Sequence, residues 1–409
     1  MKDIIVIGGG ASGLIAAIYA AKNGKKVTIL EKNKTCGKKI LITGNGKCNY
    51  WNDNQELIHY HSKNKELIEK IITKQSQKEI LNFFNTIGII PKIKDGYYYP
   101  YSNQATSIQT ALIKEAELQG VEIITEIEVI NIEKENNIFN LTTNNRIYKC
   151  NKVILSTGSK ASPKTGSDGI GYKLAESLGH SIIEPLPALV QLKSNASFLK
   201  EWHGIRSDIS VSLIENNKLI ATQTGEIQLT DYGVSGICIF CLSGQVSRGL
   251  YENKKEEISI NFLHPFNINT KEEFISWMNN RNKLVKNRTI SDLLDGILNY
   301  KLINLLIKLS KIDRNLSWDD LSNKQKEELG NNLTNFTLNI TGTNSFESSQ
   351  TCTGGIPLTE INLSTMESLK TKGLYIIGEL LDIDGDCGGY NLTNAWITGY
   401  LAGVGANND

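Results

Sequence analysis

The sequence carries almost no net charge. Its 409 residues contain 44 Lys and Arg against 43 Asp and Glu, which leaves a formal net charge of +1. Such an even balance gives no long-range field that would gather a polyanion such as tRNA or DNA. We therefore expect no nucleic-acid partner. A local basic patch around Lys283, Lys286 and Arg288 keeps an RNA-binding alternative open.

The sequence also lacks an uninterrupted apolar run of the kind that targets or spans membranes. Ile4 to Ala21 is free of charge, but the three glycines Gly8 to Gly10 interrupt it where a signal peptide would be continuous. Apolar residues make up 40% and charged residues 21%, which is typical of a globular chain. We expect no membrane association and, from the length, about two or three domains.

Disulfide and hydrolase motifs are absent as well. The seven cysteines follow no framework-like spacing, so we expect reduced thiols in a cytoplasmic protein. Cys238 and Cys241 have C-x-x-C spacing but no second cysteine pair, which favours buried thiols over a redox pair or a zinc site. Neither G-x-S-x-G nor H-E-x-x-H occurs, which argues against hydrolases that depend on those motifs.

What is present begins with one βαβ unit. Residues 3–31 run from an apolar strand through a glycine turn and an Ala-rich helix to a second strand that ends in acid. Gly8, Gly10 and Gly13 satisfy G-x-G-x-x-G. In this motif Gly8 permits a tight turn, Gly10 lets backbone N–H groups approach a pyrophosphate, and Gly13 lets the helix pack closely on the strand. The helix N-terminus adds partial positive charge. Glu31 can accept ribose hydroxyls and disfavours a 2′-phosphate, so the unit favours FAD or NAD over NADP.

The next segment, Cys36 to Asn52, is dense in Gly, Lys and Asn and lacks an amphipathic period. We expect a shaped loop that places backbone N–H groups and Lys38, Lys39 and Lys47 beside the pyrophosphate. The segment resembles the G-[KR]-K-x-L-x-[ST]-G-x-G-[KR]-C-N motif of the YhiN/BaiN-type flavoproteins, the aminoacetone-oxidase-like FAD enzymes. Lys47 stands where that family more often has Arg.

Further stretches resemble the same family in the same order along the chain. They are Tyr97 to Ala105, Val153 to Gly158, Lys164 to His180, Pro185 to Leu192, Thr351 to Ile356 and Gly373 to Gly399. By these matches the chain is identified as a member of the family. The glycines of Gly166 to Gly171 echo a second fingerprint, but they do not directly follow a strand, so we expect no separate NAD domain.

The closing segment predicts the flavin end of the site. Leu374 to Gly378 is expected to form a short buried strand followed by Glu379, whose carboxylate can take ribityl hydroxyls. The residues Gly388 to Asn391 precede a helix that we predict to run to about Gly403, so its free N–H groups and positive end can face the flavin N1–C2=O edge. That would stabilise the anionic reduced flavin. An ordinary Gly-Asn helix cap is the alternative.

The resemblance implies an α/β fold: a Rossmann-like FAD-binding domain of the two-dinucleotide type with an inserted β-barrel domain and a small helical domain. Alternating apolar runs predict antiparallel strands between Leu189 and Phe262, and Thr270 with Glu273 forms a capping box ahead of the helical block. We expect the FAD domain to span 1–187 and 351–409, the barrel domain 188–266 and 336–350, and the helical domain 267–335.

The resemblance and the motifs together nominate the FAD-binding residues. They are Gly8, Gly10, Ala11, Ser12, Gly13, Glu31, Lys32, Lys39, Ile40, Thr43, Gly44, Gly46, Cys48, Asn49, Val129, Thr157, Gly158, Gly378, Glu379, Gly388, Gly389, Tyr390 and Asn391. No catalytic residue and no metal ligand is assigned.

Several side chains carry weaker indications. His59 and His61 lack an apparent third metal ligand and are expected on a solvated surface, and His180 is expected at a helix end as a cap or surface residue. Tyr97 and Tyr99 are expected in a loop, where they either donate a proton to a substrate carbonyl or wall a pocket.

Cys48, Cys352 and Cys387 fall in segments expected near the flavin. They are read as buried spacers rather than as acids or nucleophiles, because reactivity requires a lowered pKa.

The resemblance implies an FAD-dependent oxidoreductase that NAD(P)H reduces as a transient donor. Hydride would then pass from flavin N5 to a small organic substrate such as a conjugated enone, as in the bile-acid reductase branch of the family. An O₂-using amine or aminoketone oxidase is one alternative. A flavin-dependent RNA-modification or partner-binding protein is another. The oligomeric state does not follow from the sequence.

Overall fold

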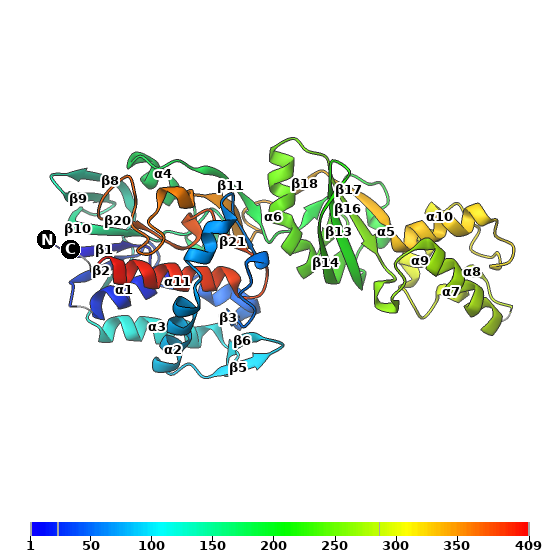
Figure 1. The fold of residues 1–409 in the computed structure, drawn as a ribbon, viewed down its shortest axis with the longest axis horizontal. Coiled ribbons are helices and arrows are strands. Elements are labelled where there is room, and N and C mark those ends of the chain that lie inside the picture. Colours follow the sequence, from blue (N-terminus) through cyan, green and yellow to red (C-terminus); the bar gives the residue numbers. More distant parts are fainter. Residues whose placement is uncertain (1, 23, 286, 408–409) are drawn as a thin grey trace. The chain divides into compact units, whose positions relative to one another are not determined.

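The computed structural model describes residues 2–22, 24–285 and 287–407, so Lys286 of the basic patch lies outside the described residues. The chain divides into two compact units (Figure 1). One comprises Met1–Pro187 and Phe346–Asp409, and the other comprises Ala188–Ser345. Each unit has its own hydrophobic core. Since strands and helices of the second unit share one core, its separation into a sheet domain and a helical domain stays a prediction.

The first unit contains five named α-helices among its described residues. They are α1 (Ala11–Lys22), α2 (Lys74–Thr86), α3 (Ala105–Leu118), α4 (Ile170–Ser177) and α11 (Tyr390–Gly405). Its strands are β1 (Lys2–Ile7), β2 (Val27–Leu30), β3 (Trp51–Asn52), β4 (Tyr60–His61), β5 (Pro91–Lys94), β6 (Tyr97–Pro100), β7 (Glu122–Ile124), β8 (Val129–Glu135), β9 (Ile138–Thr143), β10 (Ile147–Leu155), β11 (Ile183–Ala188), β19 (Thr351–Gly355), β20 (Leu374–Ile376) and β21 (Asp384–Gly385).

In the central sheet of this unit, the predicted motifs lie together at the carboxyl ends of the parallel strands. Its strand order is β7-β2-β1-β10-β9-β8, with β20 also paired to β10, and β7, β2, β1, β10 and β20 run parallel. Ile7 is in register with Leu30 and Leu155, and Leu155 with Ile376. The carboxyl ends of β1, β2, β10 and β20 therefore meet, which is where ligands bind in sheets of this kind.

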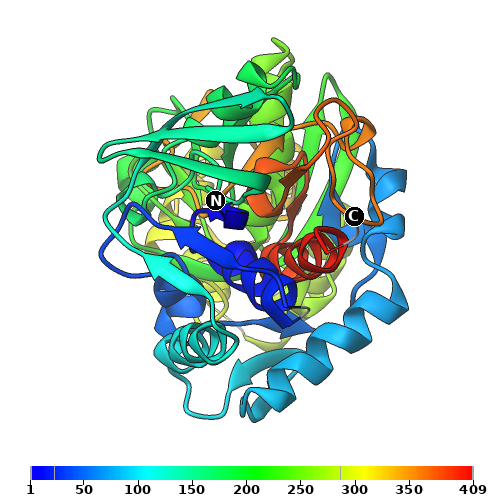
Figure 2. The ribbon, with the colours of Figure 1, turned by 90° about the vertical axis from the view of Figure 1, so that its left-hand side faces the viewer.

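Helices α1 and α11 lie side by side against the sheet, blue and red in Figure 2. A Cβ built on Gly399 would lie 2.5 Å from the carbonyl oxygen of Ser12, and one on Gly403 would lie 2.6 Å from that of Ala16. These two glycines stand four residues apart, hence on one face of α11. Their lack of a side chain lets the two helix backbones touch.

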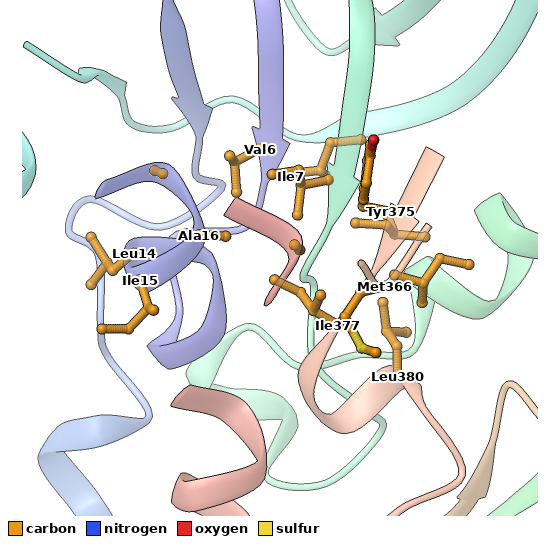
Figure 3. Close-up of a cluster of buried hydrophobic side chains, with 14 of the residues drawn as sticks. Val6, Ile7, Leu14, Ile15, Ala16, Met366, Tyr375, Ile377 and Leu380 are labelled. Atoms are coloured by element: carbon orange, nitrogen blue, oxygen red, sulfur yellow. The ribbon is translucent and has the colours of Figure 1, made fainter. Parts of the chain in front are cut away.

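Buried side chains from both ends of the chain fill the core of this unit. Figure 3 shows Val6 of β1 and Leu14 of α1 together with Tyr375, Ile377 and Leu380 of the closing segment. The closing segment therefore shares a hydrophobic core with the opening βαβ unit, and burial of these apolar surfaces fixes its place beside the glycine turn.

The second unit combines an antiparallel sheet with helices. Its helices are α5 (Leu199–Trp202), α6 (Ile237–Tyr251), α7 (Lys271–Leu284), α8 (Ile290–Leu294), α9 (Tyr300–Leu309) and α10 (Asn323–Thr334). Its strands are β12 (Leu192–Lys193), β13 (Arg206–Glu215), β14 (Lys218–Leu229), β15 (Gly233–Ser235), β16 (Glu256–Asn261), β17 (Phe336–Ile340) and β18 (Gly342–Thr343).

The sheet of the second unit curls strongly. Its order is β17-β16-β13-β14-β15-β12-β18. The two edge strands are separated in the chain by Thr341 alone, so the sheet has to bend until its edges approach. This is the geometry expected of a barrel-like insertion. The capping box of Thr270 and Glu273 is confirmed at the start of α7.

Helix α6 adds to the expectation for Leu189 to Phe262, where the sequence predicted antiparallel strands and no helix was named. The helix packs on the sheet with Cys238, Ile239, Leu242 and Val246 buried. Its apolar residues are mixed with Gly and Ser, which have lower intrinsic helix propensity than Ala, and tertiary burial overrides that preference.

The seven cysteines all lie among the described residues, and each is a free thiol. Within residues 2–22, 24–285 and 287–407, no helix combines the length and apolar character needed to cross a bilayer.

His180 follows the end of α4, where its N–H donates to the carbonyl of Ala175 at 3.1 Å, so the capping alternative is confirmed, but its side chain is buried and not at the surface. Its Nδ1 lies 2.8 Å from Oε2 of Glu360, and its Nε2 lies 2.8 Å from Oγ of Ser368. Burial lowers the pKa of His180. Burial acts to raise the pKa of Glu360, but hydrogen bonds from Lys370 and Ser181 outweigh it and lower that pKa to about 2.

We expect acid to remove the stability that Glu360 confers. A carboxyl whose folded-state pKa is depressed stabilises fully above its ordinary pKa of about 4.3 and loses that contribution as the pH falls toward about 2. Urea unfolding of wild type and Glu360→Gln should give a difference in unfolding free energy that is larger at about pH 7 than at about pH 3. Equal differences at both pH values would contradict this account.

Candidate functional site

The turn from β1 to α1 is built on glycines that no other residue could replace without movement. Gly8 has a φ of +97°, and a Cβ there would lie 2.6 Å from the carbonyl oxygen of Ser156. A Cβ on Gly13 would lie 2.1 Å from the carbonyl oxygen of Gly8. The turn and the close helix–strand contact that the sequence predicted are both present.

Gly10 stands apart from these two glycines. A Cβ built on it meets no other described atom within 4 Å, so packing of the chain itself does not require glycine there. Its carbonyl accepts the N–H of Leu14, which makes Ala11, Ser12 and Gly13 the first residues of α1. Their N–H groups have no acceptor within a helix, which leaves them free for an anion.

Glu31 lies directly after β2 with 6% of its surface exposed. Its Oε2 accepts the N–H of Gly9 at 2.8 Å, and its Oε1 accepts the N–H and the side-chain amide of Asn33 at 2.8 and 2.7 Å. The carboxylate thus fastens the glycine turn to the chain beyond β2. Because a carboxylate offers about four acceptor positions, it keeps capacity for ribose hydroxyls.

The residues around Glu31 complete this end of the site. Lys32 Nζ lies 2.6 Å from Oδ2 of Asp168, so its charge is paired. The N–H of Ile127 donates to the carbonyl of Glu31 at 3.0 Å, which brings the chain toward Val129, the buried first residue of β8.

The segment from Cys36 to Asn52, expected as a shaped loop, contains some regular structure: 3₁₀ turns over Ile40–Gly46, followed by β3. Thr43 Oγ1 donates to the carbonyl of Ile40 at 2.6 Å, and Thr43 accepts the N–H of Cys48 at 3.0 Å. Gly44 and Gly46 both have left-handed φ, +54° and +82°.

The thiols of two cysteines near this segment are strongly perturbed. Burial raises the pKa of Cys48 to about 12 and that of Cys352 to about 11. Both stay protonated at neutral pH, which supports their interpretation as spacers rather than nucleophiles. Cys387 is half-buried.

Glu379 forms an ion pair that the sequence did not predict. Lys39 Nζ lies 2.6 Å from its Oε2, and Ser159 Oγ donates to the same oxygen at 2.9 Å. Gly378, with a φ of +67°, precedes it, and a Cβ there would lie 2.6 Å from Oγ of Ser12. The closing segment therefore meets the start of α1.

Thr157 and Gly158 follow β10 at the same edge. A Cβ on Gly158, whose φ is +75°, would lie 2.5 Å from Oγ of Ser167. A Cβ on Gly171 would lie 2.0 Å from Oγ1 of Thr157, so α4 begins directly against this turn.

A second glycine turn opens α11. Gly388 and Gly389 have φ of +129° and +96°. The side-chain amide of Asn391 donates to the carbonyl of Gly385 at 2.7 Å, and its Oδ1 accepts the N–H of Gly385 at 2.9 Å. Asn391 thus closes the turn with its side chain, and α11 has no side-chain cap at its start.

Two asparagines border this turn. Asn52 Nδ2 lies 3.2 Å from the carbonyl oxygen of Gly388 and 3.1 Å from Oη of Tyr390. Oδ1 of Asn49 is buried with no hydrogen-bond partner among the described residues, and it lies 3.3 Å from a Cβ built on Gly389. An orphaned acceptor at this position fits a site that is completed by a bound donor.

Tyr97 and Tyr99 reach the two glycine turns from strand β6, which corrects their assignment to a loop. A Cβ on Gly388 would lie 2.8 Å from Cε1 of Tyr97, and one on Gly44 would lie 3.6 Å from Cε1 of Tyr99. Residues two apart on a strand share a face. Burial, with a smaller contribution from Tyr97, raises the pKa of Tyr99, so its phenol is protonated at neutral pH.

His59 and His61 are partly exposed, at 27% and 23% of their side chains, but both are bound to one carboxylate, so they are not the freely solvated residues that the sequence predicted. His59 Nδ1 lies 3.0 Å from Oδ2 of Asp386, and His61 Nε2 lies 3.1 Å from Oδ1 of the same carboxylate. Sequence reasoning missed this cluster. Across the described ranges, no group of three or more His, Cys, Asp or Glu side chains is arranged to hold a metal ion.

The comparisons with known proteins agree with this geometry. The family described as HI0933-like protein Rossmann domain matches residues 2–405. The 3-dehydro-bile acid delta(4,6)-reductase of Clostridium scindens is 39% identical over 408 residues, 99% of each chain. The ribosomal RNA dihydrouridine synthase of Escherichia coli is 28% identical over 396 residues, 96% of this chain and 95% of that one.

One solved structure extends over the whole chain. The 3-ketosteroid-delta4-(5alpha)-dehydrogenase from Rhodococcus jostii RHA1 matches 100% of this chain and 97% of its own, with 13% identity and a TM-score of 0.47.

The family match and the full-length relative show that the chain is a flavin-dependent oxidoreductase with a Rossmann-type domain that binds FAD. Within that class, the chain belongs to the HI0933-like family, as the match over nearly its full length and the 39% identical relative establish. The family expected from the motifs is thereby confirmed.

Proposed function

We propose that FAD is held along the carboxyl edge of the central sheet. The N–H groups at Gly10 and the start of α1 would bind the pyrophosphate, and Glu31 would accept ribose hydroxyls. Glu379 would take ribityl hydroxyls, and the N–H groups that open α11 would face the flavin ring. The open space at Gly10 and the orphaned oxygen of Asn49 support this assignment.

We further propose that the enzyme reduces a carbon–carbon double bond conjugated with a carbonyl, in a small apolar substrate of the steroid or bile-acid type. The observation that carries this proposal is the full-length relative, 39% identical, that is named a bile acid delta(4,6)-reductase. NAD(P)H is the proposed electron donor. It would dock transiently, because none of the four sheets other than the central one forms a second dinucleotide fold among the described residues.

Bound FAD supplies hydride chemistry, and the protein supplies position and protons. The turn opening α11 directs N–H groups and a helix N-terminus at the place where negative charge would develop. Tyr99 holds a protonated phenol beside Gly44, and Tyr97 lies over Gly388. Either hydroxyl can polarise a substrate carbonyl or return a proton to the reduced carbon, so we assign them to substrate activation.

Anaerobic spectrophotometry tests the proposed function. NADH or NADPH should bleach the flavin, and a 3-oxo-Δ4 steroid added afterwards should restore its colour without oxygen. Bleaching by an amine, with colour and hydrogen peroxide returning in air, would instead establish an oxidase. A flavin that neither nicotinamide reduces would exclude NAD(P)H as the donor.

Tyr99→Phe is expected to lower kcat with the enone by about 100-fold, since general acids contribute factors of that order. Flavin content should stay at the wild-type level, because Tyr99 contacts a glycine turn that the variant still packs against. Reduction by NAD(P)H, measured separately by stopped flow, should be unaffected. Unchanged turnover would leave Tyr99 as a pocket wall, and Tyr97→Phe serves as the paired variant.

A second candidate substrate is uridine in ribosomal RNA. Full-length relatives in Escherichia coli and Haemophilus influenzae, 28% and 27% identical, are named ribosomal RNA dihydrouridine synthases. Saturating the uracil ring is also a reduction of a double bond conjugated with a carbonyl, so the same site suits both substrates. Anaerobic flavin reoxidation by ribosomal RNA, but not by the steroid, would favour this second candidate.

A further inference from the structure

The cluster of His59, Asp386 and His61 lies inside the first unit and has no role in the functions proposed above. Each imidazole lies within hydrogen-bond distance of a different oxygen of the Asp386 carboxylate, His59 at 3.0 Å and His61 at 3.1 Å. The Asp386 side chain is 9% exposed, whereas those of His59 and His61 are 27% and 23% exposed. A nearly buried carboxylate is therefore hydrogen-bonded to two imidazole rings that are partly exposed and can exchange protons with solvent.

The cluster is tied to the turn that opens α11 by backbone and ring contacts. Strand β21 pairs with β4, and the N–H of Asp386 donates to the carbonyl of His59 at 2.9 Å. The ring of His59 stacks on Tyr390, the first residue of α11, with centroids 4.7 Å apart and planes 17° apart. Gly388 and Gly389 lie between Asp386 and Tyr390 in the chain. A change in the charge of the cluster therefore changes the electrostatic potential beside the turn proposed to face the flavin.

We propose that the His59–Asp386–His61 cluster is a proton-holding site that takes up a proton when the flavin is reduced. The histidines would touch neither the flavin nor the substrate, and their charge would act on the flavin site through Asp386 and the turn that follows it. This inference rests on the proposed place of the flavin at the start of α11. Reduction of the flavin to its anionic form adds negative charge there, which favours the protonated form of a nearby imidazole.

The charges around the cluster suit this role. Burial of His61 acts to lower its pKa, but the hydrogen bond to Asp386 and the charges of Asp386 and Asp384 outweigh that effect and raise it, while Lys65 opposes them. The pKa of His61 is therefore raised from its ordinary value, which favours the protonated imidazole. On the side of His59, Asn54 Nδ2 lies 3.2 Å from Nε2.

Proton uptake on anaerobic photoreduction of the FAD-loaded protein tests the proposal directly. With a pH-indicator dye in weak buffer, formation of the anionic reduced flavin by itself consumes one proton per two electrons. Wild type should take up a further fraction of a proton, between about 0.3 and 1, near neutral pH. His61→Gln and Asp386→Asn should lose this fraction, and His203→Gln, an exposed histidine of the second unit, should keep it. Spectra of the reduced flavin over the same pH range separate protonation of N1 from protonation of the cluster.

Uptake of a single proton by wild type at every pH from about 6 to 8 would overturn the proposal without the use of any variant. An extra fraction that both variants retain would overturn it as well. Protein that binds no FAD would refute the proposed flavin site, which is a different failure from bound flavin with no extra proton uptake.

Discussion

A Gly10→Val variant is expected to fold as wild type does and to be purified without yellow colour. The structure leaves room for this side chain, since a Cβ at residue 10 has no described neighbour within 4 Å. The same side chain would occupy the space in which a pyrophosphate approaches the backbone N–H groups of the turn. We expect FAD affinity to fall by at least about 100-fold, which corresponds to about 2.7 kcal/mol of binding free energy.

Two measurements separate this effect from misfolding. Thermal unfolding of the apoproteins should give the same midpoint for Gly10→Val and wild type, and titration with FAD should show the loss of affinity. Gly342→Ala in the second unit is the matched control, because Cβ at that position also meets nothing in the described chain. If Gly10→Val bound FAD as tightly as wild type, the pyrophosphate could not lie at this turn.

A Gly13→Val variant should behave differently. Its Cβ would lie 2.1 Å from the carbonyl oxygen of Gly8, so α1 would have to move away from β1. We therefore expect loss of apoprotein stability together with loss of flavin. The contrast between Gly10 and Gly13 distinguishes a glycine required by the ligand from one required by the fold.

The parts of the site that could be predicted from the sequence are those whose causes are local. The glycines of the first turn, the acid after β2 and the glycine turn before α11 each stand within a few residues of the element that requires them. Alternation of apolar residues predicted β13 and β16 because period two is enforced by the strand itself.

What was missed depends on partners far away in the chain. Asp386 follows His59 by 327 residues, and Glu379 follows Lys39 by 340, so no spacing in the sequence links them. His180 was placed at the surface because its partners, Glu360 and Ser368, come about 180 residues later. Such pairs form only when the fold brings distant segments together, as the antiparallel pairing of β4 with β21 does for His59 and Asp386.

Glu31 has a role in the fold that the sequence did not predict. The sequence predicts a ribose acceptor, whereas the folded carboxylate also accepts three hydrogen bonds from Gly9 and Asn33. We expect Glu31→Gln to leave one of these buried donors facing an amide NH₂, at a cost of about 1–3 kcal/mol in unfolding free energy of the apoprotein. FAD affinity should fall by about 10- to 100-fold, because the turn and the ribose lose the same charged acceptor.

Chemical unfolding of the apoprotein and FAD titration measure these two losses separately. Glu117→Gln, an exposed glutamate on α3, should change neither. A variant that lost FAD affinity at unchanged apoprotein stability would show that Glu31 serves the ribose alone, and one that lost stability at unchanged affinity would show that it serves the turn alone. The two carboxylate oxygens that close the turn are also the ones proposed to accept the ribose hydroxyls, so we expect both losses together and neither of these single outcomes.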